Sequence, residues 1–201
     1  MADPTRTQQA IVIGGSAGAL EALGALLPAL PRDYPLPIAV VLHVPPGRPS
    51  QLVNVLGLYS ALPVREADDK QPFCAGVVHV APPNYHLLLE KNGCFALSVD
   101  DPVLFSRPSI DVLFESAADA LGPLALGVLL SGANEDGAHG LLRIQRAGGQ
   151  VVVQDPDSAP ARAMPDAALR LTQPDYVLPA ARLGALLASL TFARPSLVEP
   201  R

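Results

Sequence analysis

The sequence predicts an α/β protein, a doubly wound, mainly parallel sheet with an antiparallel β-hairpin insertion. Two observations carry this prediction: four apolar, largely β-branched runs, and apolar residues at helical spacing after the first three of them. The runs are residues 10–13, 38–43, 126–130 and 150–154. Because their apolar residues are continuous rather than alternating, they suit strands buried on both faces of a parallel sheet.

Helices are expected between these strands. Leucines at helical spacing over residues 20–30 predict the first helix, and residues 51–58, after a Pro-Pro-Gly turn, predict the second. Residues 141–149 predict a third, because their apolar spacing ends at Gly-Gly, a natural helix stop. Residues 109–114 open another helix, with Ser109 as its expected N-terminal cap.

The segment 62–99 has a different pattern, in which short apolar runs are separated by turn residues. These runs are residues 77–80, 87–89 and 95–97. They predict short strands. The last two flank Asn92-Gly93, a pair typical of tight hairpins, so these two strands are expected to be antiparallel.

Composition argues against several classes of function. A net charge of -5, a pI near 5.2 and no run of Lys or Arg disfavour a nucleic-acid binder. The polar start is no signal peptide, no segment approaches the roughly 20 apolar residues of a membrane span, and a cytoplasmic location is expected. Cys74 and Cys94 form neither a disulfide framework nor a metal motif, so no metal or cofactor is expected. We expect one domain over residues 10–190, a flexible lead at 1–9 and a tail at 191–201.

Three polar residues follow strands whose carboxyl ends are expected to meet at one edge of the sheet. Ser16 follows the first apolar run, His43 ends the second, and Asp136 lies in the loop after the third. In open parallel sheets, binding and catalytic sites lie at that edge, near the point where strand order reverses. These residues are therefore the candidates for a serine nucleophile, a base and an acid.

The glycine-rich turn at residues 14–18 presents Ser16 at its centre. It reads Gly-Gly-Ser-Ala-Gly and fits G-x-S-x-G, but neither of the glycine motifs that bind nucleotide phosphates, which disfavours a nucleotide binder. The order Ser, His, Asp and the short lead exclude the α/β-hydrolase fold, whereas triads themselves occur in several orders. A glycine turn whose serine merely caps a helix is the alternative interpretation.

Alternatives also remain for the other two roles. His139 lies three residues after Asp136 and competes with His43 as the base. Glu135 is the neighbouring alternative acid, and net charge cannot separate the two carboxylates. Asp136, followed by glycine, is equally typical of a residue that starts a helix.

Four further polar residues are not counted as catalytic. His79 lies within a predicted strand and His86 follows a turn, so both are expected to be structural. Arg107 and Arg162 lie in loops that could face the same edge, but they are equally typical of solvated surface charges.

Five separated motifs then point to one family. They are IVIGGSAGALEAL at residues 11–23, LHVPPG at 42–47, RPSIDVLF at 107–114, GVLLSG through DG at 127–137, and AMP at 163–165. In their order and spacing, over roughly residues 10–190, they resemble the catalytic domain of the chemotaxis protein-glutamate methylesterase CheB. Together they are far more specific than any one of them alone.

The resemblance implies a doubly wound sheet with an antiparallel hairpin. It also implies hydrolysis of glutamate γ-methyl esters on chemoreceptors or related signalling proteins, often with deamidation of receptor glutamines. In this family's pattern Ser16 matches the nucleophile, His43 the general base, and Asp136 the acid that orients the histidine. Because it lies at the start of a helix, the backbone N–H of Ala17 is the candidate for the oxyanion hole.

The chain departs from the family's pattern at a few positions. The family usually has Thr where this chain has Ala17, Gly where it has Ala19, and Met where it has Ala133. These departures leave open an alternative function, a catalytically weak signalling or scaffold module that binds a partner protein. Chemotaxis members also carry an amino-terminal receiver domain, and the lead before Ile11 is too short for one. We therefore expect a stand-alone member or an excised catalytic domain.

Overall fold

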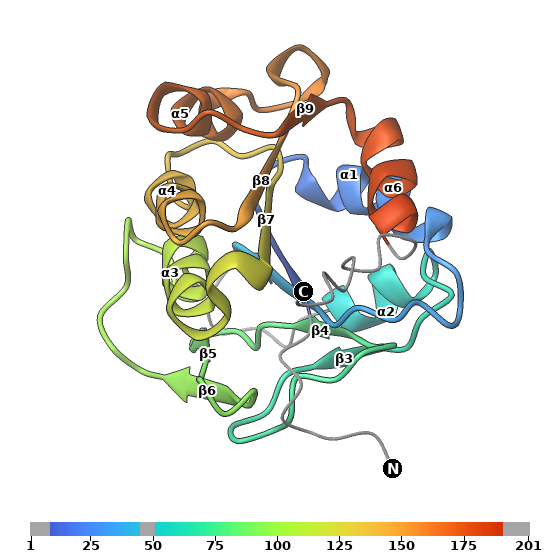
Figure 1. Ribbon diagram of the computed structural model, residues 1–201, viewed down its shortest axis with the longest axis vertical. Coiled ribbons are helices and arrows are strands. Elements are labelled where there is room, and N and C mark those ends of the chain that lie inside the picture. The colour runs from blue at the N-terminus through green and yellow to red at the C-terminus, as the bar shows by residue number, and fades with distance from the viewer. Residues whose placement is uncertain (1–8, 45–50, 191–201) are drawn as a thin grey trace, which may run out of the picture.

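The centre of the molecule is a sheet of seven strands with only parallel pairings, seen in a computed structural model that describes residues 9–44 and 51–190 (Figure 1). The strands are β1 (Ala10–Gly15), β2 (Ile38–Leu42), β3 (Val64–Glu66), β4 (Val78–Val80), β7 (Ala125–Leu129), β8 (Gln150–Gln154) and β9 (Tyr176–Leu178). Their spatial order is β3-β4-β2-β1-β7-β8-β9. The two central strands β1 and β7 are buried along their whole length, as their continuous apolar sequence predicts.

Helices cover both faces of this sheet (Figure 1). One face carries α1 (Ala19–Leu26), α2 (Leu52–Gly57) and α6 (Ala180–Ser189); the other carries α3 (Ile110–Leu121), α4 (Ala138–Arg146) and α5 (Ala163–Leu171). Single 3-10 turns lie at Leu27–Ala29, Gly122–Leu124 and Pro156–Ser158. Each face has its own apolar core, because each helix turns one apolar stripe towards the sheet. The doubly wound fold predicted from the sequence is confirmed.

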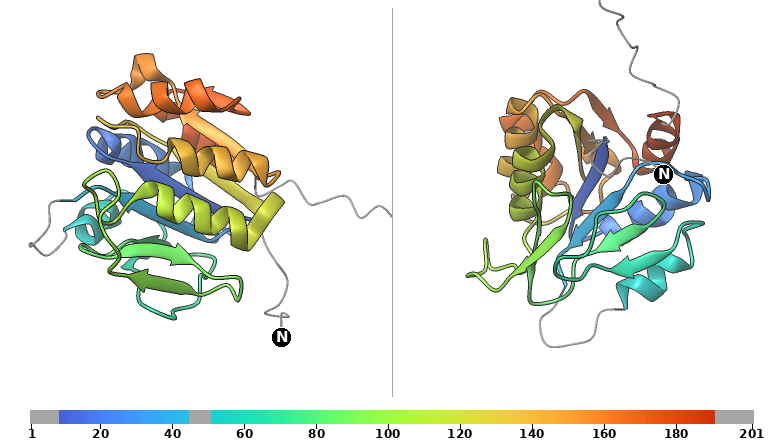
Figure 2. Two further views of the ribbon diagram at one scale, coloured as in Figure 1. Left: turned by 90° about the vertical axis from the view of Figure 1, so that its left-hand side faces the viewer. Right: turned by 60° about the horizontal axis from the view of Figure 1, so that its bottom comes forward.

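A separate antiparallel pair forms the predicted insertion. It consists of β5 (His86–Leu89) and β6 (Phe95–Ser98), which pack beside α3 (Figure 2). The connecting turn closes with a hydrogen bond from the Glu90 N–H to the Cys94 carbonyl, and Gly93 has a φ of 79°. A glycine in this left-handed conformation costs little, so the Asn-Gly pair specifies the hairpin locally.

The other predicted strands and helices are present, with ends shifted by a few residues. The run at 77–80 becomes β4 and joins the main sheet, so only β5 and β6 make up the insertion. The pattern did not predict β3, β9, α5 or α6; both strands are three-residue edge strands with exposed side chains, so they lack a continuous apolar run. The Pro-Pro-Gly turn at 45–47, residues 1–8 of the expected lead and the tail at 191–201 lie outside the described residues.

The first turn of α3 lies directly over the carboxyl ends of the central strands. A Cβ atom on Gly14, in β1, would clash with the side chain of Ile110 at the start of α3. Gly137 meets the same side chain, since a Cβ there would lie 2.6 Å from Ile110 Cγ2, and its φ of 94° also favours glycine. These two glycines therefore let the start of α3 approach the edge where the candidate residues lie.

Candidate active site

Three loops meet at the carboxyl edge of the sheet, where strand order reverses on either side of β1. Ser16 directly follows β1 and His43 directly follows β2, its parallel neighbour. The His43 N–H donates to the Gly15 carbonyl at 3.3 Å, and the Ser16 N–H donates to the Ser131 carbonyl at 2.9 Å in the loop after β7. Backbone hydrogen bonds thus hold the candidate serine between the other two loops.

His43 and Asp136 are in direct contact, although 93 residues separate them in the sequence. His43 Nε2 lies 2.7 Å from Asp136 Oδ2, and the carboxylate side chain is fully buried while 13% of the histidine side chain is exposed. An Nε2–H that donates to the carboxylate leaves the lone pair on Nδ1. Among the residues that the structure describes, Nδ1 has no hydrogen-bond partner, so the pair has the arrangement of an oriented base.

The carboxylate of Asp136 is held by the N-terminus of α3. Its Oδ1 accepts hydrogen bonds from Ser109 Oγ at 2.9 Å and the Asp111 N–H at 3.0 Å, and its Oδ2 accepts one from the Ile110 N–H at 2.8 Å. Burial alone would raise the pKa of Asp136. The hydrogen bonds from His43 and from the backbone of α3 outweigh burial and hold the pKa below its usual value. The acid is thus kept ionised at a positive helix end.

These contacts correct two expectations from the sequence. Ser109 does occupy the N-cap position of α3, but its side chain makes no capping bond; its hydroxyl donates to Asp136 instead. The cap acceptor comes from Asp136, because a buried carboxylate can accept several of the free N–H groups that begin a helix. Asp136 does not cap its own following helix, since the N-cap of α4 is Gly137, without a side-chain cap.

The reading of Ser16 as a helix cap is also wrong. The N-cap of α1 is Gly18, again without a side-chain cap, and the Ser16 side chain is only half-buried. Within the described ranges no hydrogen bond joins Ser16 Oγ to His43, and such bonds often tighten only when substrate binds. Ser16 thus follows β1 where its parallel neighbour β2 leads into His43.

Ser131 fixes the Ala17–Gly18 peptide, one residue beyond Ser16. Its buried Oγ donates to the Ala17 carbonyl at 2.7 Å and accepts from the Ala161 N–H at 2.9 Å. The Ala17 N–H, on the other side of the same residue, has no acceptor among the residues that the structure describes. An unused donor next to Ser16 is one requirement for the candidate role of Ala17 in an oxyanion hole.

The competing candidates for the base and the acid are not bonded to the His43–Asp136 pair in the described part of the chain. His139 and Glu135 are both exposed, and in the described part of the chain neither forms a hydrogen bond with His43 or Asp136. His79 is buried in β4 against the rings of Phe73 and Phe95, and burial lowers its pKa. The sequence alone left Glu135 and His139 open as alternatives, and the structure shows that Asp136 is the residue in contact with His43.

Two supporting residues were missed by sequence reasoning. Ser131 appeared only as part of a motif, and His86 was expected to be structural. His86 Nδ1 accepts the Ser109 N–H at 3.1 Å, while Nε2 lies 3.1 Å from the Asp101 carbonyl, so this ring supports the residue that donates to Asp136. No local pattern signals these roles, since each depends on contacts between distant segments.

Arg107 and Arg162 differ in their surroundings. Arg162 forms exposed ion pairs with Asp157 and Asp166, as expected of a solvated charge. Arg107 Nη1 donates to the carbonyls of Val99 and Asp100 at 2.7 and 2.9 Å, which ties together the loop that precedes α3. Arg107 is therefore a loop support at the edge of the site.

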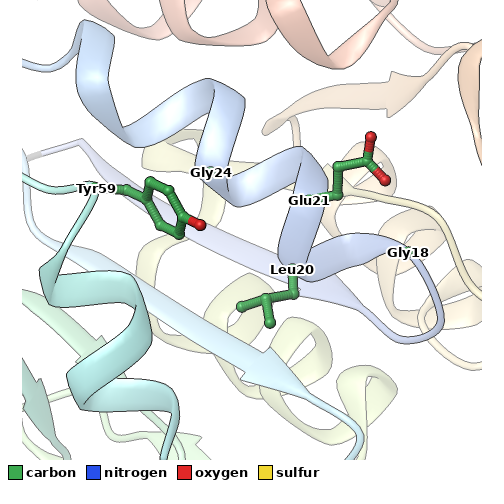
Figure 3. A pocket seen from close by; sticks show the side chains of 5 residues that line it. All are labelled: Gly18, Leu20, Glu21, Gly24 and Tyr59. Carbon is green, nitrogen blue, oxygen red and sulfur yellow. The ribbon is translucent and has the colours of Figure 1, made fainter.

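A pocket of about 130 Å³ lies beside His43, and its wall includes Asn84, Phe105 and Arg107. A larger hollow of about 580 Å³ lies along the outer side of α1 (Figure 3). Gly18, Leu20, Glu21, Gly24 and Tyr59 line it. None of the three candidate residues lines this hollow, and of the three only His43 lines the smaller pocket. Among residues 9–44 and 51–190, no three His, Cys, Asp or Glu side chains are grouped to hold a metal ion, and no helix is long and apolar enough to cross a bilayer.

Together these features define a class of protein: doubly wound α/β proteins with a serine turn, a histidine and a buried aspartate at one edge of the sheet. Serine hydrolases have this set of residues. The model of the CheB methylesterase family matches residues 11–187. The chain therefore belongs to the CheB methylesterase family. The fold, family and hydrolase class predicted from the sequence are confirmed.

Similar proteins agree with this assignment. A protein of Leptospira interrogans is 43% identical over 182 residues, which cover 90% of this chain and 94% of that protein. Protein-glutamate methylesterase/protein-glutamine glutaminase 1 of Anaeromyxobacter dehalogenans is 41% identical, and the match covers 92% of this chain but 52% of the relative. The crystal structure of the Thermotoga maritima CheB methylesterase catalytic domain matches with a TM-score of 0.87 and 34% identity, covering 91% of this chain and 98% of that one.

Proposed function

We propose that this chain hydrolyses glutamate γ-methyl esters in a methylated chemoreceptor or a related signalling protein of the cytoplasm, within a domain over residues 10–190. The observation that carries the proposal is the contact between His43 and Asp136 at the edge where Ser16 follows β1. Relatives named protein-glutamate methylesterase/protein-glutamine glutaminase support both the ester substrate and deamidation of glutamine.

In the first half of the reaction Ser16 Oγ attacks the ester carbonyl carbon while His43 takes the hydroxyl proton. The tetrahedral intermediate then loses the methoxy group, which leaves as methanol with the proton that His43 returns. Asp136 holds the imidazole in one tautomer and stabilises the imidazolium that forms. This leaves the glutamyl side chain esterified to Ser16.

In the second half His43 takes a proton from water, whose oxygen attacks the acyl carbon. The tetrahedral intermediate then collapses as His43 returns this proton to Ser16 Oγ, which releases glutamate and the free serine. The negative oxygen in both halves needs a fixed donor, and the Ala17 N–H is our candidate. Donors of this kind contribute about 3 kcal/mol to transition-state stabilisation in comparable enzymes. Replacement of the family's usual Thr by Ala17 is compatible with this role, because only the backbone donates.

The test is methanol release from receptor preparations methylated by the methyltransferase of the same organism. The native chain is compared with Ser16→Ala and with Ser189→Ala, a control that removes an exposed serine at the end of α6. Alkali releases all methyl esters and so counts the substrate present. We expect release by the native chain and the control, and its loss in Ser16→Ala.

Two outcomes would contradict this proposal. Full release by Ser16→Ala would exclude Ser16 as the nucleophile. No release by the native chain, with alkali showing that ester was present, would favour a catalytically weak module that binds a partner. Ammonia release from receptors that carry glutamine at the same sites tests deamidation separately.

A further inference from the structure

A tight hairpin turn forms part of the wall of the pocket beside His43. Val103 and Ser106 exchange both backbone hydrogen bonds, at 3.1 and 2.8 Å, and so enclose Leu104 and Phe105 as a two-residue turn. The φ angles of these two central residues are 48° and 64°. Positive φ at both central positions is the geometry of the type I′ turn.

Leucine and phenylalanine are unusual residues for this turn. Their Cβ atoms are crowded at positive φ, so Asn-Gly or Asp-Gly normally occupies such positions. The fold gains no burial in return at Phe105, because its side chain is fully exposed, at 103% relative accessibility. The turn therefore holds a large aromatic ring in solvent against both backbone preference and the hydrophobic effect.

The position of the turn connects this strain with the site. Phe105 and His43 line the same pocket of about 130 Å³. Arg107, two residues further on, ties the loop to the carbonyls of Val99 and Asp100, and the chain then enters the turn of α3 that holds Asp136. The backbone turn that carries the ring is thus tied to the loop that leads into the site of the proposed base. Backbone strain of this kind is found mainly where function requires it.

We propose that Phe105 is a substrate-positioning residue, whose ring packs on an apolar side chain of the substrate polypeptide next to the esterified glutamate that enters the pocket at His43. This rests on the proposed function. An apolar partner is favoured because the ring offers only carbon surface and Val99, on the same loop, is also largely exposed. Binding of the polypeptide would bury the ring and so select a protein ester over a small ester.

The turn allows a matched pair of variants. The double substitution Leu104→Asn with Phe105→Gly gives the sequence that type I′ turns prefer, so it keeps the hairpin and removes the ring. Leu104→Asn alone relaxes the turn and keeps the ring. For each protein we compare kcat/KM for methanol release from the methylated receptor with kcat/KM for a small p-nitrophenyl ester. The ratio of the two does not depend on the fraction of active enzyme.

We expect this ratio to fall about tenfold in the double variant, mainly through a higher KM for the receptor, and to stay within about twofold of native in Leu104→Asn. An unchanged ratio in the double variant, with the receptor still hydrolysed, would overturn the role of Phe105 alone. No receptor hydrolysis by the native chain, with ester present, would instead overturn the proposed function and this inference together.

Discussion

Asp136 and Ser16 lie at the same edge of the sheet but in very different surroundings. The carboxylate of Asp136 is fully buried and accepts four hydrogen bonds, from His43, Ser109 and two N–H groups of α3. Ser16 is half-buried in a turn held by backbone bonds and by the bond from Ser131 Oγ to the Ala17 carbonyl, and its own hydroxyl does not cap α1. Asp136 thus links α3 to the candidate site, whereas Ser16 lies on a turn whose stability does not depend on its side chain.

This difference identifies where the stability of the fold and the proposed catalysis depend on the same hydrogen bonds. Around Asp136 the same hydrogen bonds fix the start of α3 and orient the base, so one substitution affects both. Ser16 is half-buried and Phe105 is exposed, so their side chains contribute little to the stability of the fold. Four experiments test this contrast, and they are given in order of decreasing expected effect.

Asp136→Ala should lower both activity and stability. Methanol release should fall by a factor of about 10³ or more, since the base loses its orienting acid. The free energy of unfolding should fall by about 3 kcal/mol, because buried donors of α3 lose their acceptor. In urea unfolding Ser16→Ala should match native within about 0.5 kcal/mol despite its lost activity. Equal destabilisation of the two variants would refute the contrast.

Asp111 lies beside Asp136, and its contribution to the stability of the fold should change with pH in the opposite direction to that of Asp136. Burial, the largest cause, and the nearby charge of Asp136 raise the pKa of Asp111 to about 6, despite its bond from the Gly140 N–H. A carboxyl whose pKa is raised on folding favours the native state when protonated, so its contribution declines between about pH 4 and 6 and stays low above. Asp136, whose pKa is lowered, stabilises the fold above the pKa of the unfolded chain and loses this effect in acid.

The variant Asp111→Asn tests the direction of this pH dependence. The amide oxygen can still accept the Gly140 N–H, but it carries no charge. The variant should exceed native in unfolding free energy by about 3 kcal/mol at pH 7.5 and differ little at pH 4, as a raised pKa of this size implies. Urea titrations at both pH values check it. A gain that is the same at both would show that Asp111 does not titrate in this range.

Ser109→Ala should have a moderate effect on both quantities. It removes one of the two donors to Asp136 Oδ1, while the Asp111 N–H remains. We expect a loss of about 1 kcal/mol in unfolding free energy and about a fivefold lower kcat. Ser189→Ala is the matched control, measured by the same assays. A kcat that equals that of the control would mean that Ser109 only supports the helix.

Leu104→Asn should have the smallest effect on stability and, unlike Asp136→Ala and Ser109→Ala, should raise it. Asparagine tolerates the φ of 48° better than leucine, so the unfolding free energy should rise by about 0.5–1 kcal/mol. A thermal melt would register this gain as a higher Tm. A lower Tm would mean that the half-exposed Leu104 side chain contributes more than the turn conformation costs.

Wherever the signal is local, the sequence predicted the fold well. The buried strands follow from continuous apolar runs, and the β5–β6 hairpin follows from Asn92-Gly93. The short edge strands β3 and β9 escaped prediction because three half-exposed residues resemble a loop. The turn at residues 103–106 was also missed, since Leu-Phe contradicts the turn chemistry that sequence reasoning relies on.

For the site, the sequence by itself determined which residues follow the strands and hence that Ser16, His43 and Asp136 face one edge. Only the tertiary structure decided that Asp136 rather than Glu135 contacts the histidine, and that this carboxylate, not the Ser109 side chain, caps α3. The reason is physical: strand burial depends on neighbours along the chain, whereas these hydrogen bonds join segments up to 93 residues apart, brought together only by packing of helices on the sheet.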